Sequence, residues 1–145
     1  PGLRGTHQLD NAGLAAACFC DLASKGLLAS LPRNSDRKIL ASGVESAVWP
    51  GRVQHLATGA LARHWPHQAI WLDGAHNAHG AQALAAALWQ IHRGKWNIIC
   101  GALNTRNPAE FIAPLADLAG PVRCLAIPDQ DASLSAFIAE KWSKS

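Results

Sequence analysis

Asp73, His76 and Asn77 form a polar turn between the apolar run 69–72 and an alanine-rich stretch. A short apolar run, a turn containing glycine and a helical pattern are together typical of a βα unit. In open α/β sheets such turns lie at the carboxyl ends of strands, where ligands bind. A carboxylate there can accept hydrogen bonds from a ribose diol, and a histidine at a helix start can contact phosphate. The turn is therefore a candidate nucleotide site.

A second candidate is Arg52, which directly follows the turn-forming pair Pro50-Gly51. Its guanidinium would offer a fixed fork of donors for a phosphate or a base edge. Trp49 and Trp71 flank the two segments and are expected to wall the site. A purely structural explanation stays open on local pattern alone, because Asp-Gly turns and asparagine helix caps are common.

Other polar residues give weaker signals. His7 and Asn11 could simply cap the start of a helix. Two histidine pairs have metal-like spacing without an obvious third ligand nearby, so surface or capping roles are favoured; they are His64-x-x-His67 and His76-x-x-His79. Four cysteines lack disulfide-framework spacing and are expected to be buried, reduced thiols: Cys18, Cys20, Cys100 and Cys124.

Hydrophobic periodicity and turn signals predict the elements that position these residues. Helices are expected over 7–25, from Ser35 or Asp36 through Val48, over 78–93, over 108–119 with Asn107 as its cap, and from 129 through 142. Strands are expected over 52–58, 69–72, 96–103 and 122–127, the first two as an antiparallel pair. The pattern predicts an α/β, Rossmann-like fold with a mostly parallel sheet, helices on both faces and one antiparallel edge hairpin.

The composition is that of an ordinary globular domain, with 145 residues, 49% of them hydrophobic and 16% charged. The net charge of +3 is too small and too scattered to indicate a nucleic-acid partner. No apolar run approaches the length of a membrane span, and no secretory leader is evident. Since the chain has no methionine and begins with proline, we expect it to be a piece of a longer protein.

Three motifs in this order resemble the folylpolyglutamate synthase/dihydrofolate synthase family, a branch of the Mur ligase superfamily. They are Gly-Thr-His-Gln-Leu-Asp-Asn-Ala at 5–12, Trp-Pro-Gly-Arg-Val-Gln at 49–54 and Leu-Asp-Gly-Ala-His-Asn at 72–77. Each motif is weak alone, but the ordered set is specific and the resemblance covers the whole chain. It implies that residues 1–34 are the end of a central ATPase domain plus a linker. Residues 35–145 would be a truncated C-terminal Rossmann-like ligase domain.

The resemblance also implies an activity: a carboxylate of dihydropteroate or folate is activated by ATP and Mg²⁺ as an acyl phosphate, and glutamate attacks it to form an amide. By correspondence with the motifs, Asn11 would contact adenine, Arg52 would approach the nucleotide, and Asp73 and His76 would approach ribose and phosphate. The parent enzyme would be a cytoplasmic monomer of folate biosynthesis. Which of the two ligations it performs stays open.

Departures from the family pattern limit what this chain should do alone. A glycine-rich phosphate loop ending in Gly-Lys-Ser or Gly-Lys-Thr is absent from the 145 residues, and the magnesium ligands would belong to the same missing part. We therefore expect the isolated chain to be inactive and its partner to be the N-terminal ATPase domain. Two other classes stay open, another Mur-type ligase and a non-catalytic Rossmann-like module that binds a nucleotide or a partner.

Overall fold

A computed structural model describes residues 2–28, 36–101, 103 and 108–129 of the chain. The chain forms two compact units, Pro1–Asp73 and Gly74–Ser145. The predicted cap at Asn107 and the last predicted helix, beyond Asp129, lie outside the described residues. None of the helices in the described part of the chain has the length and apolar character needed to span a bilayer.

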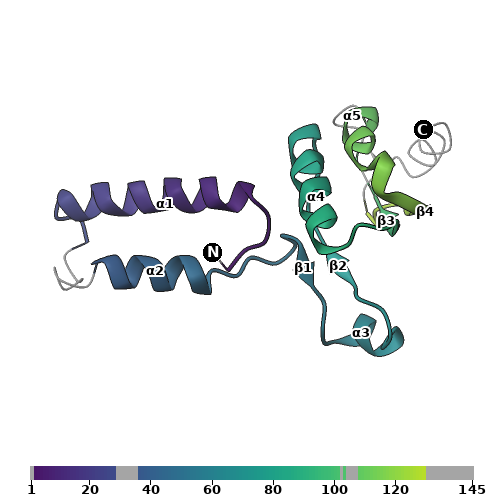
Figure 1. Cartoon of the computed structure of the whole chain (residues 1–145), viewed down its shortest axis with the longest axis horizontal. Helices are drawn as coiled ribbons and strands as arrows, with labels where there is room; N and C mark the ends of the chain where they lie inside the picture. The colour runs from purple at the N-terminus through teal and green to yellow at the C-terminus, as the bar shows by residue number, and fades with distance from the viewer. Residues whose placement is uncertain (1, 29–35, 102, 104–107, 130–145) are drawn as a thin grey trace. The chain divides into compact units, whose positions relative to one another are not determined.

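The first unit begins with two helices that lie side by side, α1 (His7–Ser24) and α2 (Asp36–Ser46) (Figure 1). Alanine and leucine favour the helical backbone of α1. Gly26 ends α1 with φ of 69°, and the amides of Gly26 and Leu27 donate to the carbonyls of Ala23 and Leu22. This is a Schellman motif, which glycine allows because it has no Cβ. The predicted helix 7–25 is confirmed.

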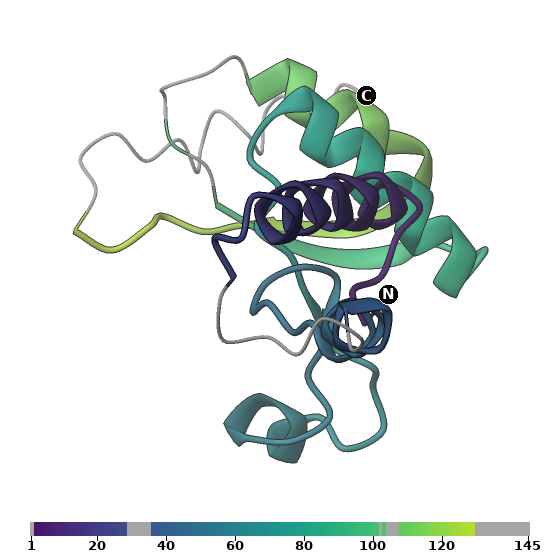
Figure 2. The same ribbon diagram turned by 90° about the vertical axis from the view of Figure 1, so that its left-hand side faces the viewer.

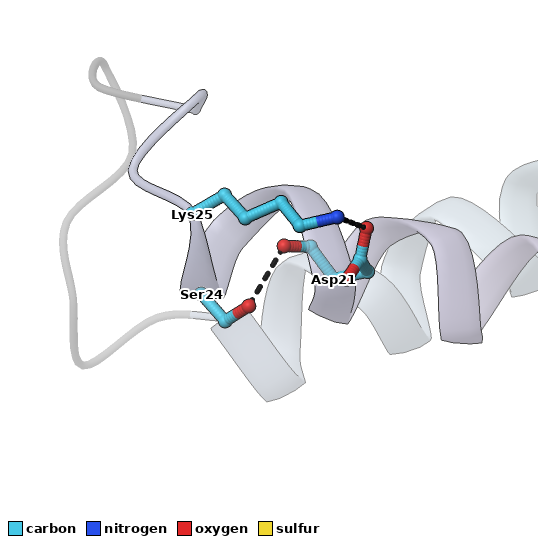
Figure 3. Close-up of polar contacts among 3 residues, drawn as sticks. All are labelled: Asp21, Ser24 and Lys25. Carbon is cyan, nitrogen blue, oxygen red and sulfur yellow. Dashed lines mark hydrogen bonds and ion pairs between the residues drawn. The ribbon is translucent and has the colours of Figure 1, made fainter.

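The last turn of α1 carries a small polar cluster at the surface (Figure 3). Lys25 Nζ lies 2.6 Å from Asp21 Oδ2, and Ser24 Oγ donates to the Asp21 carbonyl at 2.8 Å. Both charged side chains are more than half exposed, at 60% and 57%. Solvent therefore screens the pair, and its contribution to stability is at most about 0.5 kcal/mol.

Most of α1 is not buried by the described residues. Gln8 is its only residue below a tenth exposure in that part of the chain, while Leu9 and Leu14 are 58% and 67% exposed. Cys18 and Cys20 are exposed as well, so their predicted burial is wrong. The reason is that α1 is apolar on more sides than α2 can cover. The second helix also ends earlier than predicted, at Ser46, and leaves Val48 83% exposed.

A short antiparallel hairpin completes the first unit. Strand β1 (Gln54–His55) pairs with β2 (Trp71–Leu72) in the register Gln54 with Leu72 and His55 with Trp71. The predicted antiparallel pair is confirmed, although each strand has only two residues. The connection contains a short helix, α3 (Ala60–His64), which the sequence did not predict and which lies at the far end of the hairpin (Figure 1).

The second unit packs three helical segments beside a parallel strand pair. In chain order the elements are α4 (Ala78–Ile91), β3 (Trp96–Cys100), α5 (Pro108–Ile112), the 3₁₀ helix η1 (Ala113–Leu118) and β4 (Ala119–Cys124). Helices α4 and α5 lie on one side of the strands (Figure 2). The buried apolar side chains come from all three helical segments: Ala81, Ala87, Leu88, Ile112, Leu115 and Leu118. Three of these positions lie within the predicted helix 108–119, which the structure divides into α5 and η1.

Strand β4 differs from its prediction at both ends. It covers 119–124, whereas the prediction was 122–127. We expected Gly120-Pro121 to interrupt the chain before the strand, but a register shift accommodates them inside it: Ala119 pairs with Trp96 and Val122 with Ile98. This is a bulge, one of the few places where a sheet tolerates proline, because a bulged residue has no ladder hydrogen bond to donate.

The described strands form two separate two-stranded sheets, β1–β2 and β3–β4, of which only the second is parallel. One face of β3–β4 is exposed, including Asn97, Ile99 and Arg123. The helix predicted to follow β4 lies outside the described residues. A mixed α/β organisation is thus observed, and the larger, mostly parallel sheet stays a prediction.

Candidate functional site

The turn between α2 and β1 carries Arg52 and has an unusual backbone. Gly51 has φ of 71° and Val53 has φ of 45°. The Gly51 amide donates to Gln54 Oε1 at 2.9 Å, which closes the turn on the first residue of β1. The Val53 side chain is 4% exposed, whereas Arg52 is exposed. The turn therefore anchors itself through Val53 and directs Arg52 to the surface.

Asp73 follows β2 directly and is tied to this turn. Its Oδ2 accepts a hydrogen bond of 2.8 Å from the Val53 amide, across a separation of 20 residues in the sequence. Asp73 is partly buried, not walled into the core. Two of the predicted site residues, Arg52 and Asp73, are thus brought together, and they are joined through the residue that follows the arginine.

Trp71 is the centre of a stack beside Asp73. The His55 ring lies on it with centroids 4.7 Å apart and planes inclined by 28°, and the Arg4 guanidinium lies 5.1 Å from the ring centroid. Stacked and cation–π contacts of this kind hold a tryptophan in one orientation. Trp71 is thus held two residues before Asp73, and its place in the wall of a site stays a prediction. Trp49, by contrast, is 65% exposed.

Sequence reasoning missed Arg4 and His55. His55 had a usable signal, because an antiparallel pair with the observed register places it directly opposite Trp71. Arg4 had none, since it precedes α1 and is far from Trp71 in the sequence.

Asn11 does not cap α1. The helix begins at His7, its cap position is Thr6, and that residue makes no side-chain cap bond. The Asn11 amide nitrogen instead donates to Gln8 Oε1 at 3.1 Å, and Gln8 Nε2 lies 2.8 Å from His7 Nε2. Gln8 is 6% exposed and holds both neighbours together, a role that the sequence analysis also missed. The capping explanation for His7 and Asn11 is therefore wrong.

His76 and Asn77 belong to the second unit. His76 is exposed, and its Nδ1 lies 2.9 Å from the Gly74 carbonyl oxygen. A neutral ring that donates from Nδ1 presents an acceptor at Nε2, whereas a protonated ring presents a second donor suited to a phosphate oxygen. Asn77 caps α4, because its Oδ1 accepts from the Gly80 amide at 2.8 Å. For Asn77 the structural role is thus established.

The histidine pairs and the cysteines bear on the question of a metal site. Within the described ranges, no three histidine, cysteine, aspartate or glutamate side chains are grouped so that they could hold a metal ion. Cys100 and Cys124 lie opposite each other on β3 and β4 with sulfur atoms 3.9 Å apart, and both are half-buried free thiols. Burial, together with the neighbouring Cys124, raises the pKa of the Cys100 thiol to about 12.

Comparison with known proteins identifies relatives of this chain. No family model matches the chain. It is 29% identical over 140 residues to a probable bifunctional folylpolyglutamate synthase/dihydropteroate synthase of Halobacterium salinarum, a match that covers 95% of this chain and 15% of the relative.

Two solved structures are also similar. One is the Mycobacterium tuberculosis folylpolyglutamate synthase complexed with ADP, with a TM-score of 0.69 and 23% identity over 98% of this chain and 28% of that one. At that identity the likeness concerns the fold. The other is a Yersinia pestis bifunctional folylpolyglutamate synthase/dihydrofolate synthase complexed with AMPPNP and Mn, with a TM-score of 0.61 and 27% identity over 77% of this chain and 25% of that one.

The chain therefore spans between about a seventh and just over a quarter of the length of these proteins. All three are named as folylpolyglutamate synthases, and two of them carry a second activity in their names. The resemblance inferred from the three motifs is confirmed: the chain matches a segment of this group.

Proposed function

We propose, from the similarity of this chain to segments of folylpolyglutamate and dihydrofolate synthases, that it is the C-terminal part of an ATP-dependent ligase. The parent enzyme adds glutamate to dihydropteroate, to folate or to both through an acyl phosphate. The observation that carries the proposal is the hydrogen bond between Asp73 and the Val53 amide. It joins the Trp-Pro-Gly-Arg turn to the Asp-Gly-Ala-His-Asn turn, two of the three motifs that the chain shares with the family.

The residues of this segment fit a nucleotide. Arg52 is exposed in the turn whose Val53 amide is bound by Asp73, and a guanidinium pairs with phosphate oxygens through two parallel hydrogen bonds. His76 adds an exposed imidazole close to the start of α4. In this proposal Asn11 contacts adenine, while Asp73 and His76 approach ribose and phosphate. ATP supplies the phosphoryl group that activates the acceptor carboxylate.

The divalent cation would be held elsewhere. No suitable group of ligands occurs in the described part of this chain, and the phosphate loop is absent from its sequence. A neighbouring relative was solved with Mn and AMPPNP, which supports a requirement for a divalent ion. We propose Mg²⁺ as the physiological ion, bound by the central ATPase domain of the parent.

The proposed organisation follows the family. Residues 1–34 end the central domain and form the linker, and residues 35–145 belong to a Rossmann-like domain with a mostly parallel sheet and helices on both faces. The exposed leucines of α1, including Leu9 and Leu14, support this division, because the body of a central domain would cover them. We further propose that the parent is a cytoplasmic monomer.

The test uses the full-length protein that carries this segment. With Mg²⁺, ATP and glutamate, ADP release should depend on dihydropteroate or tetrahydrofolate. Release that depends instead on a muramyl peptide would assign the protein to another Mur-type ligase. The isolated 145 residues should release no ADP under any of these conditions, and turnover by them would contradict the proposed division of the site.

A further inference from the structure

Val53 adopts a backbone conformation that its side chain opposes. Its φ of 45° lies in the left-handed region, which branched side chains avoid because Cβ crowds the following carbonyl. Among the described residues the only other non-glycine residue with positive φ is Asp129. Such a conformation persists only when surrounding contacts impose it, and it is found preferentially at functional sites.

Three contacts impose it here. The side chain is buried to 4% exposure, the preceding Gly51 amide is held by Gln54 Oε1 at 2.9 Å, and the Val53 amide itself is held by Asp73 Oδ2 at 2.8 Å. A hydrogen bond to a charged acceptor is stronger than one between neutral groups. Of the two hydrogen bonds, the one from Asp73 comes from the residue that follows β2.

Arg52 lies between the two constrained residues. Gly51 and Val53 fix the backbone on both sides of it, so the direction in which its side chain leaves the turn depends on both. A change of φ at Val53 from the left-handed to the ordinary region would rotate the peptide plane that follows Arg52. Asp73 therefore influences the direction of the Arg52 side chain through the Val53 amide.

We propose that Asp73 and Val53 are positioning residues, in which the Asp73 carboxylate holds Val53 in its left-handed conformation and thereby aims Arg52 at the nucleotide. This role rests on the proposed function, and it adds an indirect contribution of Asp73 to any direct contact with ribose. Through this hydrogen bond the Asp73 carboxylate connects the end of β2 with the turn before β1.

A matched pair of substitutions separates the hydrogen bond to the Val53 amide from the negative charge of Asp73. Asp73→Asn keeps a side-chain oxygen that can accept from the Val53 amide, whereas Asp73→Ala removes the acceptor. In the full-length enzyme we expect the KM for ATP to rise about tenfold in Asp73→Ala and no more than about threefold in Asp73→Asn. The kcat should change little in either variant, whereas general loss of structure would lower the active fraction and leave KM unchanged.

A double-mutant cycle with Arg52→Ala tests whether Asp73 acts through the arginine. If it does, the double variant should resemble the single variants, with a KM for ATP raised about tenfold and not about a hundredfold. Multiplicative effects, or an Asp73→Asn variant as impaired as Asp73→Ala, would overturn the proposal.

Amide exchange gives a readout that is independent of activity. The Val53 amide should exchange faster with solvent deuterium in full-length Asp73→Ala and remain protected in Asp73→Asn. Unchanged protection in Asp73→Ala would show that the bond does not hold the turn. Failure of the wild-type enzyme to ligate glutamate would overturn the proposed function, and with it this role of Arg52, whereas multiplicative effects in an active enzyme would overturn the positioning role alone.

Discussion

The β1–β2 hairpin and the β3–β4 pair contain two strands each, but they are stabilised by different interactions. In the hairpin the strands are two residues long, and specific contacts hold them. The Asp73–Val53 and Gly51–Gln54 hydrogen bonds hold the turn before β1, and the stack of His55 on Trp71 joins the two strands. In the second unit the strands are five and six residues long, and a layer of buried helical side chains supports them.

The difference concerns what each region has to do. Burial is non-directional and holds elements together without fixing the orientation of any one polar group. Hydrogen bonds and ring stacking are directional, and they suit a surface that must present Arg52 and Asp73 in one arrangement. We therefore expect the hairpin to be disturbed by the loss of a single hydrogen-bonding atom. The second unit should be destabilised by changes in the volume of its buried side chains.

The largest effect is expected in the second unit. Ile112 is 1% exposed, so Ile112→Ala should lower the free energy of unfolding by about 2 to 5 kcal/mol through lost burial and the cavity left behind. Urea denaturation followed by circular dichroism measures this. Ile99→Ala is the matched control, because that isoleucine is 69% exposed and should cost less than about 1 kcal/mol. Equal losses would mean that burial does not distinguish the two positions.

The second prediction concerns the thiols of the same unit. Since burial and Cys124 raise the pKa of Cys100 from 9.0 to about 12, little thiolate forms near neutral pH. Iodoacetamide should therefore alkylate Cys100 at least about tenfold more slowly than the exposed Cys18 and Cys20 at pH 8. Mass spectrometry of peptides gives the rates, and equal rates at all three would contradict the raised pKa.

The same shift sets a pH dependence of stability. The folded state binds more protons than the unfolded state between pH 9.0 and about 12, so the free energy of unfolding should be flat below this range and fall as pH rises through it. The contribution is reduced by solvent, because Cys100 is only half-buried. Cys100→Ala should flatten the fall, and an unchanged profile would assign it to other groups.

A smaller effect is expected from the stack in the hairpin. Arg4→Ala removes the guanidinium from the Trp71 ring and should cost about 0.5 to 1 kcal/mol, the range for an exposed cation–π contact. Arg4→Lys keeps the charge but not the planar group and should retain part of it. Urea denaturation of the two variants provides the comparison, and an unchanged Arg4→Ala would show that His55 alone holds the ring.

The smallest effect is expected at the surface of α1. Lys25→Ala removes the pair with Asp21 and should change the free energy of unfolding by at most about 0.5 kcal/mol. Thermal unfolding at low and high salt provides the measurement, since screening removes this difference. A loss above about 1 kcal/mol would show that the pair is less exposed to solvent than its geometry indicates.

Local pattern predicted the regular elements well. Helix α1, its glycine stop, helix α4 and the antiparallel pairing of β1 with β2 all followed from periodicity and turn residues. These features depend on neighbours in the sequence. The exposure of Cys18 and Cys20 could not be predicted in this way, because it depends on what packs against α1.

The candidate site was predicted in its residues but not in its geometry. The motifs identified Arg52 and Asp73, yet no sequence signal indicates that a valine would have positive φ or that the aspartate would hold its amide. Propensity argues against that conformation, so only the tertiary contacts reveal it. The bulge in β4 was missed for the same reason, since glycine and proline favour a break wherever neighbouring strands do not impose pairing.

The bulge in β4 also decides which side of the strand is apolar. With its additional residue, Cys124 lies opposite Cys100, and Arg123 points to solvent. A regular strand starting from the same Trp96–Ala119 pair would place Arg123 opposite Cys100 instead, on the side that the helices cover. Straightening the strand without shortening it would thus turn a cation inward and two apolar groups outward, whereas deleting Gly120 or Pro121 would leave Arg123 opposite Ile99. The bulge at Gly120-Pro121 thus keeps the charged side chain of Arg123 exposed to solvent.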